Sequence, residues 1–251
     1  AVMREFEPDW IISMGGGSPI DAAKAMWAFY EYPETTFEDL ITPFNFPELR
    51  QKAKFCAIPS TSGTATEVTA FSVITDYKKG IKYPLADFNI TPDVAIIDPA
   101  LAETMPPKLV AHTGMDALTH AVEAYIGGST TRETRKMAEK AVYLVHQYLK
   151  RAYDNGHDKE ARKGMLKAAY YAGVAFTKSY VGYVHAVAHS LGGRYNVPHG
   201  LANAVILPHV LEAYGSSAYK KLHDLAVVIG ISVPQESHKT GAEKFIAAVK
   251  E

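Results

Sequence analysis

Cysteine is nearly absent from this 251-residue sequence: Cys56 is the single example, so no disulfide can form within the chain. Its neighbours in the run 55–58 are mostly apolar, which predicts a buried and unreactive thiol. Long apolar runs are absent too, because no segment approaches the roughly 18 apolar residues that a membrane-spanning helix needs. These absences exclude a disulfide-stapled scaffold and argue against a transmembrane protein.

An excess of charge of either sign is also missing. The 26 Lys and Arg residues nearly balance the 27 Asp and Glu residues, and the basic residues are scattered along the chain. Proteins that bind nucleic acid or an anionic membrane carry clustered basic residues, so we expect neither partner. Residues 1–10 have neither the basic start nor the apolar stretch of a signal peptide, and we therefore expect a cytoplasmic protein.

Apolar residues make up 47% of the chain and charged residues 21%, a composition typical of a globular protein with a sizeable core. In the first part, short apolar runs alternate with small-residue turns and with a helix for which Ser18 is the expected N-cap and Pro19 the first residue. The expected strands are residues 10–14, 54–59, 71–75, 81–83 and 93–97, and the expected loop is 33–47. This alternation predicts an α/β domain with a mostly parallel sheet over residues 1–104.

Strand patterns nearly vanish after Met105, and apolar residues recur at helical spacing instead. The expected helices are residues 109–125, 132–153, 159–178, 183–191, 204–214 and 218–230. The change of pattern predicts a second, all-helical domain over residues 105–251.

The helical part contains the strongest chemical signal. Asp116 and His120 lie four residues apart, as do His185 and His189, so each pair shares one helix face. His199 follows in the loop-like sequence NVPHG. Three imidazoles and one carboxylate can complete a four-ligand site for a divalent transition metal. Imidazole suits iron, zinc, copper or nickel, and the carboxylate favours the harder of these ions.

Each of these pairs also has an ordinary interpretation. A His-x3-His pair on an apolar helix is more often buried or partner-facing, and an Asp-x3-His pair can be a plain hydrogen bond within one helix. The residues from Ala186 to Gly193 are small and apolar, however, and a buried histidine without a polar partner is costly. Core packing is favoured for His112 and a place near the cleft for His209. The surface is expected to hold His146, His157, His223 and His238.

Two small-residue turns follow the first two expected strands. The glycines at 15–17 precede a helix, whose free N–H groups and dipole attract an anion, although the turn lacks the GxGxxG pattern. By itself such a turn is more often only a sharp bend. The second turn, residues 60–64, offers hydroxyl and N–H groups in a similar setting. Two turns at the same edge of a parallel sheet favour a nucleotide as ligand.

Four segments, in this order and spacing, resemble a known family: GGGSPID, PSTSGTATEV, GMDALTHAVEAY and GYVHAVAHSLGGRYNVPHG. The sequence resembles the iron-containing (group III) alcohol dehydrogenases, above all butanol dehydrogenases and the alcohol dehydrogenase half of bifunctional aldehyde-alcohol dehydrogenases. This resemblance covers most of the chain. It implies a partial dinucleotide-binding α/β domain, then a helical metal-binding domain, with the metal in the cleft between them.

The resemblance also implies a role for individual residues. The metal ligands would be Asp116, His120, His185 and His199, and His189 would line the active site without binding the metal. The cofactor would lie against Gly16, Gly17, Ser18, Asp21, Thr61, Ser62, Thr64 and Lys82.

The implied activity is hydride transfer between NAD or NADP and a small primary alcohol or aldehyde, with Fe²⁺, or Zn²⁺ in the same ligands, as Lewis acid. His189 would relay the hydroxyl proton outward. Phe71, Val181 and Tyr183 suggest a pocket for a short aliphatic chain. Family members are homo-oligomers, such as dimers, and carry further segments at both ends. The residue that selects NAD or NADP lies before residue 1 in that comparison.

Other interpretations stay open at this stage. A related metal-dependent polyol dehydrogenase would share the fold but differ in its helical motifs. A metal-dependent lyase or hydrolase is a further alternative, and a hydrolase would have no nicotinamide site. A truncated, non-catalytic metal-binding fragment would keep the ligands and lack turnover.

Overall fold

A three-stranded parallel sheet lies in the first half of the chain. The computed structural model describes residues 2–251, and its sheet has the strand order β1-β2-β5 with both pairs parallel. The elements of this half are α1 (Val2–Phe6), β1 (Trp10–Gly15), α2 (Gly17–Glu31), α3 (Phe37–Ile41), β2 (Lys54–Pro59), η1 (Thr66–Val68), β3 (Phe71–Asp76), β4 (Ile81–Ala86), η2 (Phe88–Ile90), β5 (Val94–Ala95) and η3 (Pro99–Ala102).

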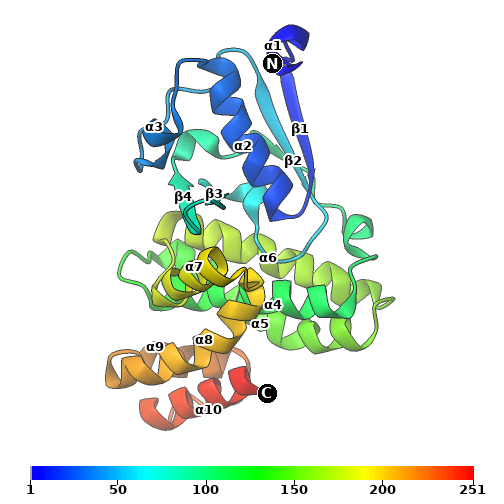
Figure 1. Ribbon diagram of the computed structural model, residues 1–251. Coiled ribbons are helices and arrows are strands. Elements are labelled where there is room, and N and C mark those ends of the chain that lie inside the picture. The colour runs from blue at the N-terminus through cyan, green and yellow to red at the C-terminus, as the bar shows by residue number, and fades with distance from the viewer. Residues whose placement is uncertain (1) are drawn as a thin grey trace.

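The two faces of this sheet differ. Helix α2 covers one face of the sheet (Figure 1). On this face Trp27 packs against Phe55 of β2 with ring centroids 5.3 Å apart. On β1 the alternate residues point the other way, and Ile12 and Met14 are 67% and 59% exposed. The sheet is therefore packed on one side and presents apolar side chains on the other.

Strands β3 and β4 form a separate antiparallel hairpin rather than extending the parallel sheet. A turn at residues 77–80 joins them, with Gly80 at φ +65°, a value that glycine adopts without strain. The expected mostly parallel sheet is thus confirmed for three strands, while the other two build a ribbon that packs on α7.

The second half is helical, as expected. Its elements are α4 (Pro107–Ile126), α5 (Arg132–Asp154), α6 (Lys159–Ser179), α7 (Tyr183–Tyr195), α8 (His199–Tyr214), η4 (Gly215–Ser217), α9 (Tyr219–Val228) and α10 (His238–Lys250). Helices α4, α5 and α6 pack together beside the sheet, and α9 and α10 lie at the far end (Figure 1). The domain boundary near residue 105 remains a prediction; β5 ends at Ala95 and α4 begins at Pro107.

Two expectations about the first half are wrong in detail. The N-cap of α2 is Gly16, not Ser18, and no side chain caps this helix. Gly16 has the extended backbone of an N-cap, so the helix begins two residues earlier than the preference for a capping side chain such as that of Ser18 predicts. In the expected loop, α3 forms because Thr36 and Asp39 make a reciprocal capping box.

Two histidines of the second half also lie elsewhere than expected. His199 is the first residue of α8 rather than part of a loop, since Pro198 serves as the N-cap. His223 is buried at 3% exposure, because α10 covers it and Ser232 lies 3.3 Å from its Nδ1. None of the helices within residues 2–251 has the length and apolar character that crossing a membrane requires.

Candidate metal and cofactor site

A cavity of about 530 Å³ lies between the two halves of the chain. Most of the site residues expected from sequence line it. From the first half these are Gly17, Ser18, Asp21, Thr64 and Lys82, and from the second half Asp116, His120, His185, His189 and His199. Gly16, Thr61 and Ser62 do not line this cavity; Gly16 and Thr61 pack against each other behind it.

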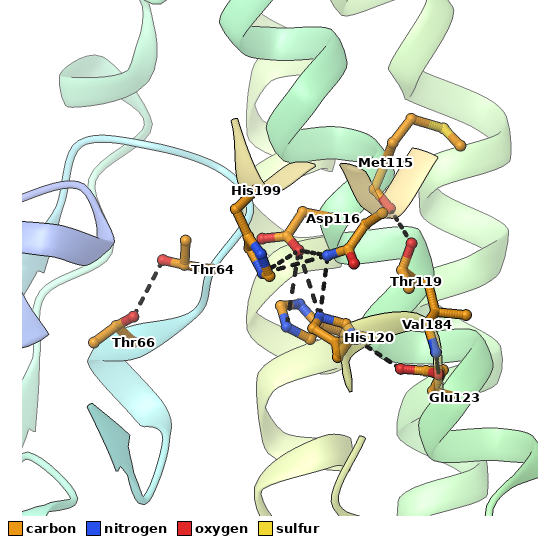
Figure 2. A network of polar contacts seen from close by, with 11 residues as sticks. Thr64, Thr66, Met115, Asp116, Thr119, His120, Glu123, Val184 and His199 are labelled. Atoms are coloured by element: carbon orange, nitrogen blue, oxygen red, sulfur yellow. Dashed lines mark hydrogen bonds and ion pairs between the residues drawn. The ribbon is translucent and has the colours of Figure 1, made fainter. Parts of the chain in front are cut away.

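Four side chains of the helical half converge at one end of the cavity. Asp116 and His120 lie one turn apart on α4, His185 comes from α7, and His199 starts α8. One ligand atom from each of the four lies within 4.8 Å of the others, an arrangement that can hold a metal ion. The Nε2 atoms of His199, His185 and His120 are 3.3, 3.6 and 3.9 Å from Asp116 Oδ1 (Figure 2).

The hydrogen bonds around these ligands indicate that a cation fits between them. Glu123 Oε2 lies 2.6 Å from His185 Nδ1 and accepts its proton. The other ring nitrogen, His185 Nε2, then faces Asp116 Oδ1 across 3.6 Å. Two acceptors at that separation repel unless a hydrogen-bond donor, such as the Asn203 amide that lies near both, or a positive charge, a proton or a metal cation, lies between them. Three imidazoles and one carboxylate form a donor set suited to iron or zinc.

The pKa shifts of Asp116, His120 and His185 support the same conclusion. Burial opposes the charge on Asp116, but the surrounding histidines outweigh it and hold its pKa well below the usual value. Burial lowers the pKa of His120 to about 3, so this ring is neutral and can offer a nitrogen lone pair to a metal ion. Burial also disfavours a charged His185, yet hydrogen bonds to Asp116 and Glu123 raise its pKa to about 9. The position between His185 and Asp116 therefore attracts positive charge.

Sequence reasoning missed one side chain at the centre of this cluster. Asn203 is fully buried on α8, and its Nδ2 donates to Asp116 Oδ1 at 2.7 Å. The same nitrogen lies 3.2 Å from His185 Nε2 and 3.3 Å from His199 Nε2. Its place one turn after His199 is the signal that the sequence offers, but asparagine is common on helix faces and does not by itself indicate a site.

His189 also lines the cavity but lies outside the four-residue cluster. Its ring centroid is 6.0 Å from that of His185 and 5.1 Å from that of His199. Burial, then the neighbouring histidines and Lys82, lower its pKa to about 3, so the ring is neutral at ordinary pH. A neutral imidazole has one donor and one acceptor nitrogen, so it can relay a proton from one ring nitrogen to the other without a lasting charge.

The first half contributes an open helix end to the cavity. Because the N-cap Gly16 has no side chain that could cap α2, the first N–H groups of this helix remain available to an anion. Space there is tight: a Cβ atom on Gly17 would lie 2.9 Å from Thr64 Cγ2, and one on Gly16 would lie 3.3 Å from Thr61 Cγ2. The glycines allow the two turns to meet, which places backbone donors and hydroxyl groups side by side, as a phosphate requires.

Buried charges lie just behind that helix end. Lys24 is fully buried and donates to the carbonyls of Thr69 at 2.6 Å and Phe71 at 2.9 Å. Burial raises the pKa of Asp21, which lines the cavity, to about 7, although Lys24 opposes the shift. Burial likewise raises the pKa of Glu67 to about 7. Partial protonation of these carboxyl groups reduces their repulsion of a bound phosphate.

An apolar wall completes the cavity. Phe71 stacks on Phe176 with ring centroids 5.9 Å apart, and Tyr180 meets Phe71 edge-on at 6.3 Å. Val181 also lines the cavity, as expected from sequence. Tyr183 does not, because at the start of α7 its side chain points outward and is 68% exposed.

The chain matches two family descriptions over nearly its whole length. Residues 1–99 match "Iron-containing alcohol dehydrogenase", and residues 110–251 match "Fe-containing alcohol dehydrogenase family, C-terminal".

Several known proteins are similar to this chain. It is 56% identical over 250 residues to the NADPH-dependent butanol dehydrogenase of Clostridium saccharobutylicum, covering 100% of this chain and 63% of that protein. It is 42% identical over 272 residues to the aldehyde-alcohol dehydrogenase of Streptococcus pneumoniae, covering 100% of this chain and 30% of that one.

Solved structures agree. A 1,3-propanediol oxidoreductase superposes with a TM-score of 0.93 at 38% identity, over 99% of this chain and 64% of that one. The chain thus spans less than two thirds of the length of the relatives it matches. With both halves matched in order and the fold shared, the chain belongs to the iron-containing alcohol dehydrogenase family.

Proposed function

We propose that this chain forms the metal-binding and cofactor-binding surfaces of an alcohol dehydrogenase, which transfers hydride between NAD or NADP and a small primary alcohol or aldehyde. The observation that carries the proposal is the shared cavity. The cluster of Asp116 and three histidines faces the same space as the open N-terminus of α2. Hydride transfer needs the substrate carbon and the nicotinamide held in contact, which one cavity can achieve.

Each part of the cavity has a role in this proposal. Asp116, His120, His185 and His199 hold Fe²⁺, or Zn²⁺ in the same ligands, and the ion supplies Lewis-acid stabilisation of charge on the substrate oxygen. Gly17 and Ser18 bind the cofactor pyrophosphate with backbone N–H groups, beside Asp21, and Gly16 supports this turn as the N-cap although it does not line the cavity. Thr61, Ser62 and Thr64 form the second turn of this site. Lys82 binds the ribose, and His189 accepts the hydroxyl proton and passes it outward.

The apolar wall supports a small, uncharged substrate. The side chains of Phe71, Phe176 and Val181 give part of the cavity an apolar surface, which suits the aliphatic chain of a small alcohol. The similarity to a butanol dehydrogenase points the same way. Because that relative is described as NADPH-dependent, NADPH is the first cofactor to test.

The assembly and location belong to the same proposal. We expect a homo-oligomer in the cytoplasm. The exposed apolar side chains of Ile12 and Met14 on β1 support association, because such patches are normally covered.

Reconstitution tests the proposal directly. Protein purified without oxygen is loaded with Fe²⁺ and mixed with butanal and NADPH, then with NADH, while the absorbance of the reduced nicotinamide is followed. We expect turnover that a chelator abolishes and added Fe²⁺ restores. Asp116→Asn and His199→Ala should each weaken metal binding by more than about 100-fold. Substitution of a residue that only hydrogen-bonds to a metal ligand typically costs less than this.

The controls separate the alternatives. Ser217→Ala, on η4 and outside the cavity, should behave as wild type. Wild-type metal content in the His199→Ala variant contradicts the ligand assignment. Tight metal binding without turnover with either cofactor contradicts the dehydrogenase and supports a non-catalytic metal-binding chain.

A further inference from the structure

The helix face that carries Asp116 and His120 continues to a third acidic side chain. Glu123 follows His120 by three residues on α4, so it lies on nearly the same face one turn further along. It is only 3% exposed, deeper than most carboxylates tolerate without a charged partner. A carboxylate at this depth needs hydrogen-bond or charged partners, which helix packing alone does not provide.

Both oxygens of Glu123 contact α7. Oε2 lies 2.6 Å from His185 Nδ1, and Oε1 accepts the Val184 N–H at 2.8 Å (Figure 2). Gly182, just before α7, makes this approach possible, because a Cβ atom there would lie 2.8 Å from Oε1. One carboxylate thus binds both a free N–H at the start of α7 and the ring of its first histidine.

We propose that Glu123 is a positioning residue that sets the tautomer and orientation of His185 for metal binding. The inference rests on the proposed role of His185 as a ligand. A carboxylate is an acceptor only, so it holds the ring proton on Nδ1. The lone pair of Nε2 is then directed toward Asp116 and the point where the donors converge. Carboxylates behind metal-binding histidines act in this way generally.

The other ligand histidines lack such support. Within residues 2–251, the buried Nδ1 atoms of His120 and His199 find no hydrogen-bond partner. His185 is therefore the ligand histidine whose Nδ1 has a hydrogen-bond partner, whereas the Asn203 amide lies near the Nε2 atoms of both His185 and His199. Glu123 also joins α4 to α7 through two hydrogen bonds, so one carboxylate links two ligand-bearing helices.

Glu123→Gln is the informative variant because it preserves size while changing the donor pattern. The glutamine Oε1 can still accept the Val184 N–H, which leaves its NH₂ group facing His185 Nδ1. That nitrogen must then be the acceptor, and the proton moves to Nε2, where it blocks the metal. Glu123→Asp keeps an acceptor-only group on a shorter stem and should restore part of the function.

Metal affinity is measured by competition with a chelator, and ligand geometry by the visible spectrum of the Co²⁺-loaded protein. We expect Glu123→Gln to bind Co²⁺ and Zn²⁺ about 10–100-fold more weakly with an altered spectrum, and Glu123→Asp to lie between it and wild type. Thr119→Val, a buried position on α4 whose hydroxyl bonds only its own helix, should keep wild-type affinity.

Three outcomes count against the inference. If Glu123→Gln binds metal as wild type does while His199→Ala does not, Glu123 has no positioning role. If only the melting temperature of the metal-free variant falls, the role is purely structural. Wild-type binding by His199→Ala is a different failure, because it removes the proposed ligand set itself. If Glu123→Gln does not fold, the test falls on Glu123→Asp, whose shorter side chain cannot reach both α7 groups. Wild-type metal affinity and a wild-type spectrum in that variant count against the proposal.

Discussion

Tyr180 has a backbone conformation that residues with a side chain rarely adopt. It ends α6 with φ +63° and ψ −178°, a region used almost only by glycine, at a cost of about 1–3 kcal/mol. Its ring forms part of the cavity wall and meets Phe71 edge-on. The side chain and the strain occur together at the site, which suggests that the ring has a function in the cavity.

Two substitutions separate the ring from the strain. Tyr180→Ala removes the ring and keeps the strained conformation, whereas Tyr180→Gly removes both. We expect the glycine variant to be more stable than the alanine variant by about 1 kcal/mol, the reverse of the usual order in helices and strands. Urea unfolding measures the difference. An alanine variant of equal or greater stability means that the backbone is not strained.

At the scale of elements, the site depends on a close contact between α4 and α8. A Cβ atom on Gly200 would lie 2.0 Å from the carbonyl oxygen of His112, so α8 approaches α4 only where a side chain is missing. His199 precedes this glycine, and Asp116 lies one turn after His112. The contact therefore sets the distance between two proposed ligands.

Gly200→Ala tests this dependence. The added methyl group must push α8 away from α4, which should destabilise the fold by about 1–3 kcal/mol and weaken metal binding by about tenfold or more. Gly164→Ala is a matched control, because its methyl group meets the Tyr148 ring at 2.2 Å, between α5 and α6. The control should lose stability but not metal affinity. Equal affinities in both variants contradict the proposed dependence.

At the scale of the whole molecule, the proposed metal links segments that are distant in sequence. Its ligands lie on α4, α7 and α8 and span residues 116–199, with α5 and α6 in between. The unfolded chain has no preformed site, so binding free energy adds to the stability of the folded state.

Chelation should therefore destabilise the protein. With free metal at about 100 times its Kd, the loaded protein should be about 2.7 kcal/mol more stable than the metal-free protein. Calorimetry with and without chelator measures the change in melting temperature. The change should vanish in His199→Ala, and an equal melting temperature in wild type with and without metal contradicts the linkage.

Regular spacing was enough to predict much of this fold. The four-residue spacing of Asp116 and His120 predicted their shared face on α4, and apolar periodicity predicted the main helices within a few residues. The strand near residue 94 is shorter than expected, and α3 was missed because its capping box lies in a Pro-rich stretch. Caps and ends depend on single side-chain contacts, which periodicity does not record.

Local patterns by themselves determined the α/β-then-helical order, the paired ligand positions and the two small-residue turns, because each arises from residues close together in the chain. Only the tertiary structure decided which side chains meet across elements. The partners Glu123 and His185 are 62 positions apart, and Asn203 reaches Asp116 across 87. The packing of the helices also leaves His223 buried and Tyr183 exposed, contrary to expectation. Such contacts depend on how helices pack against one another, and the spacing of residues within one helix carries no information about its neighbour.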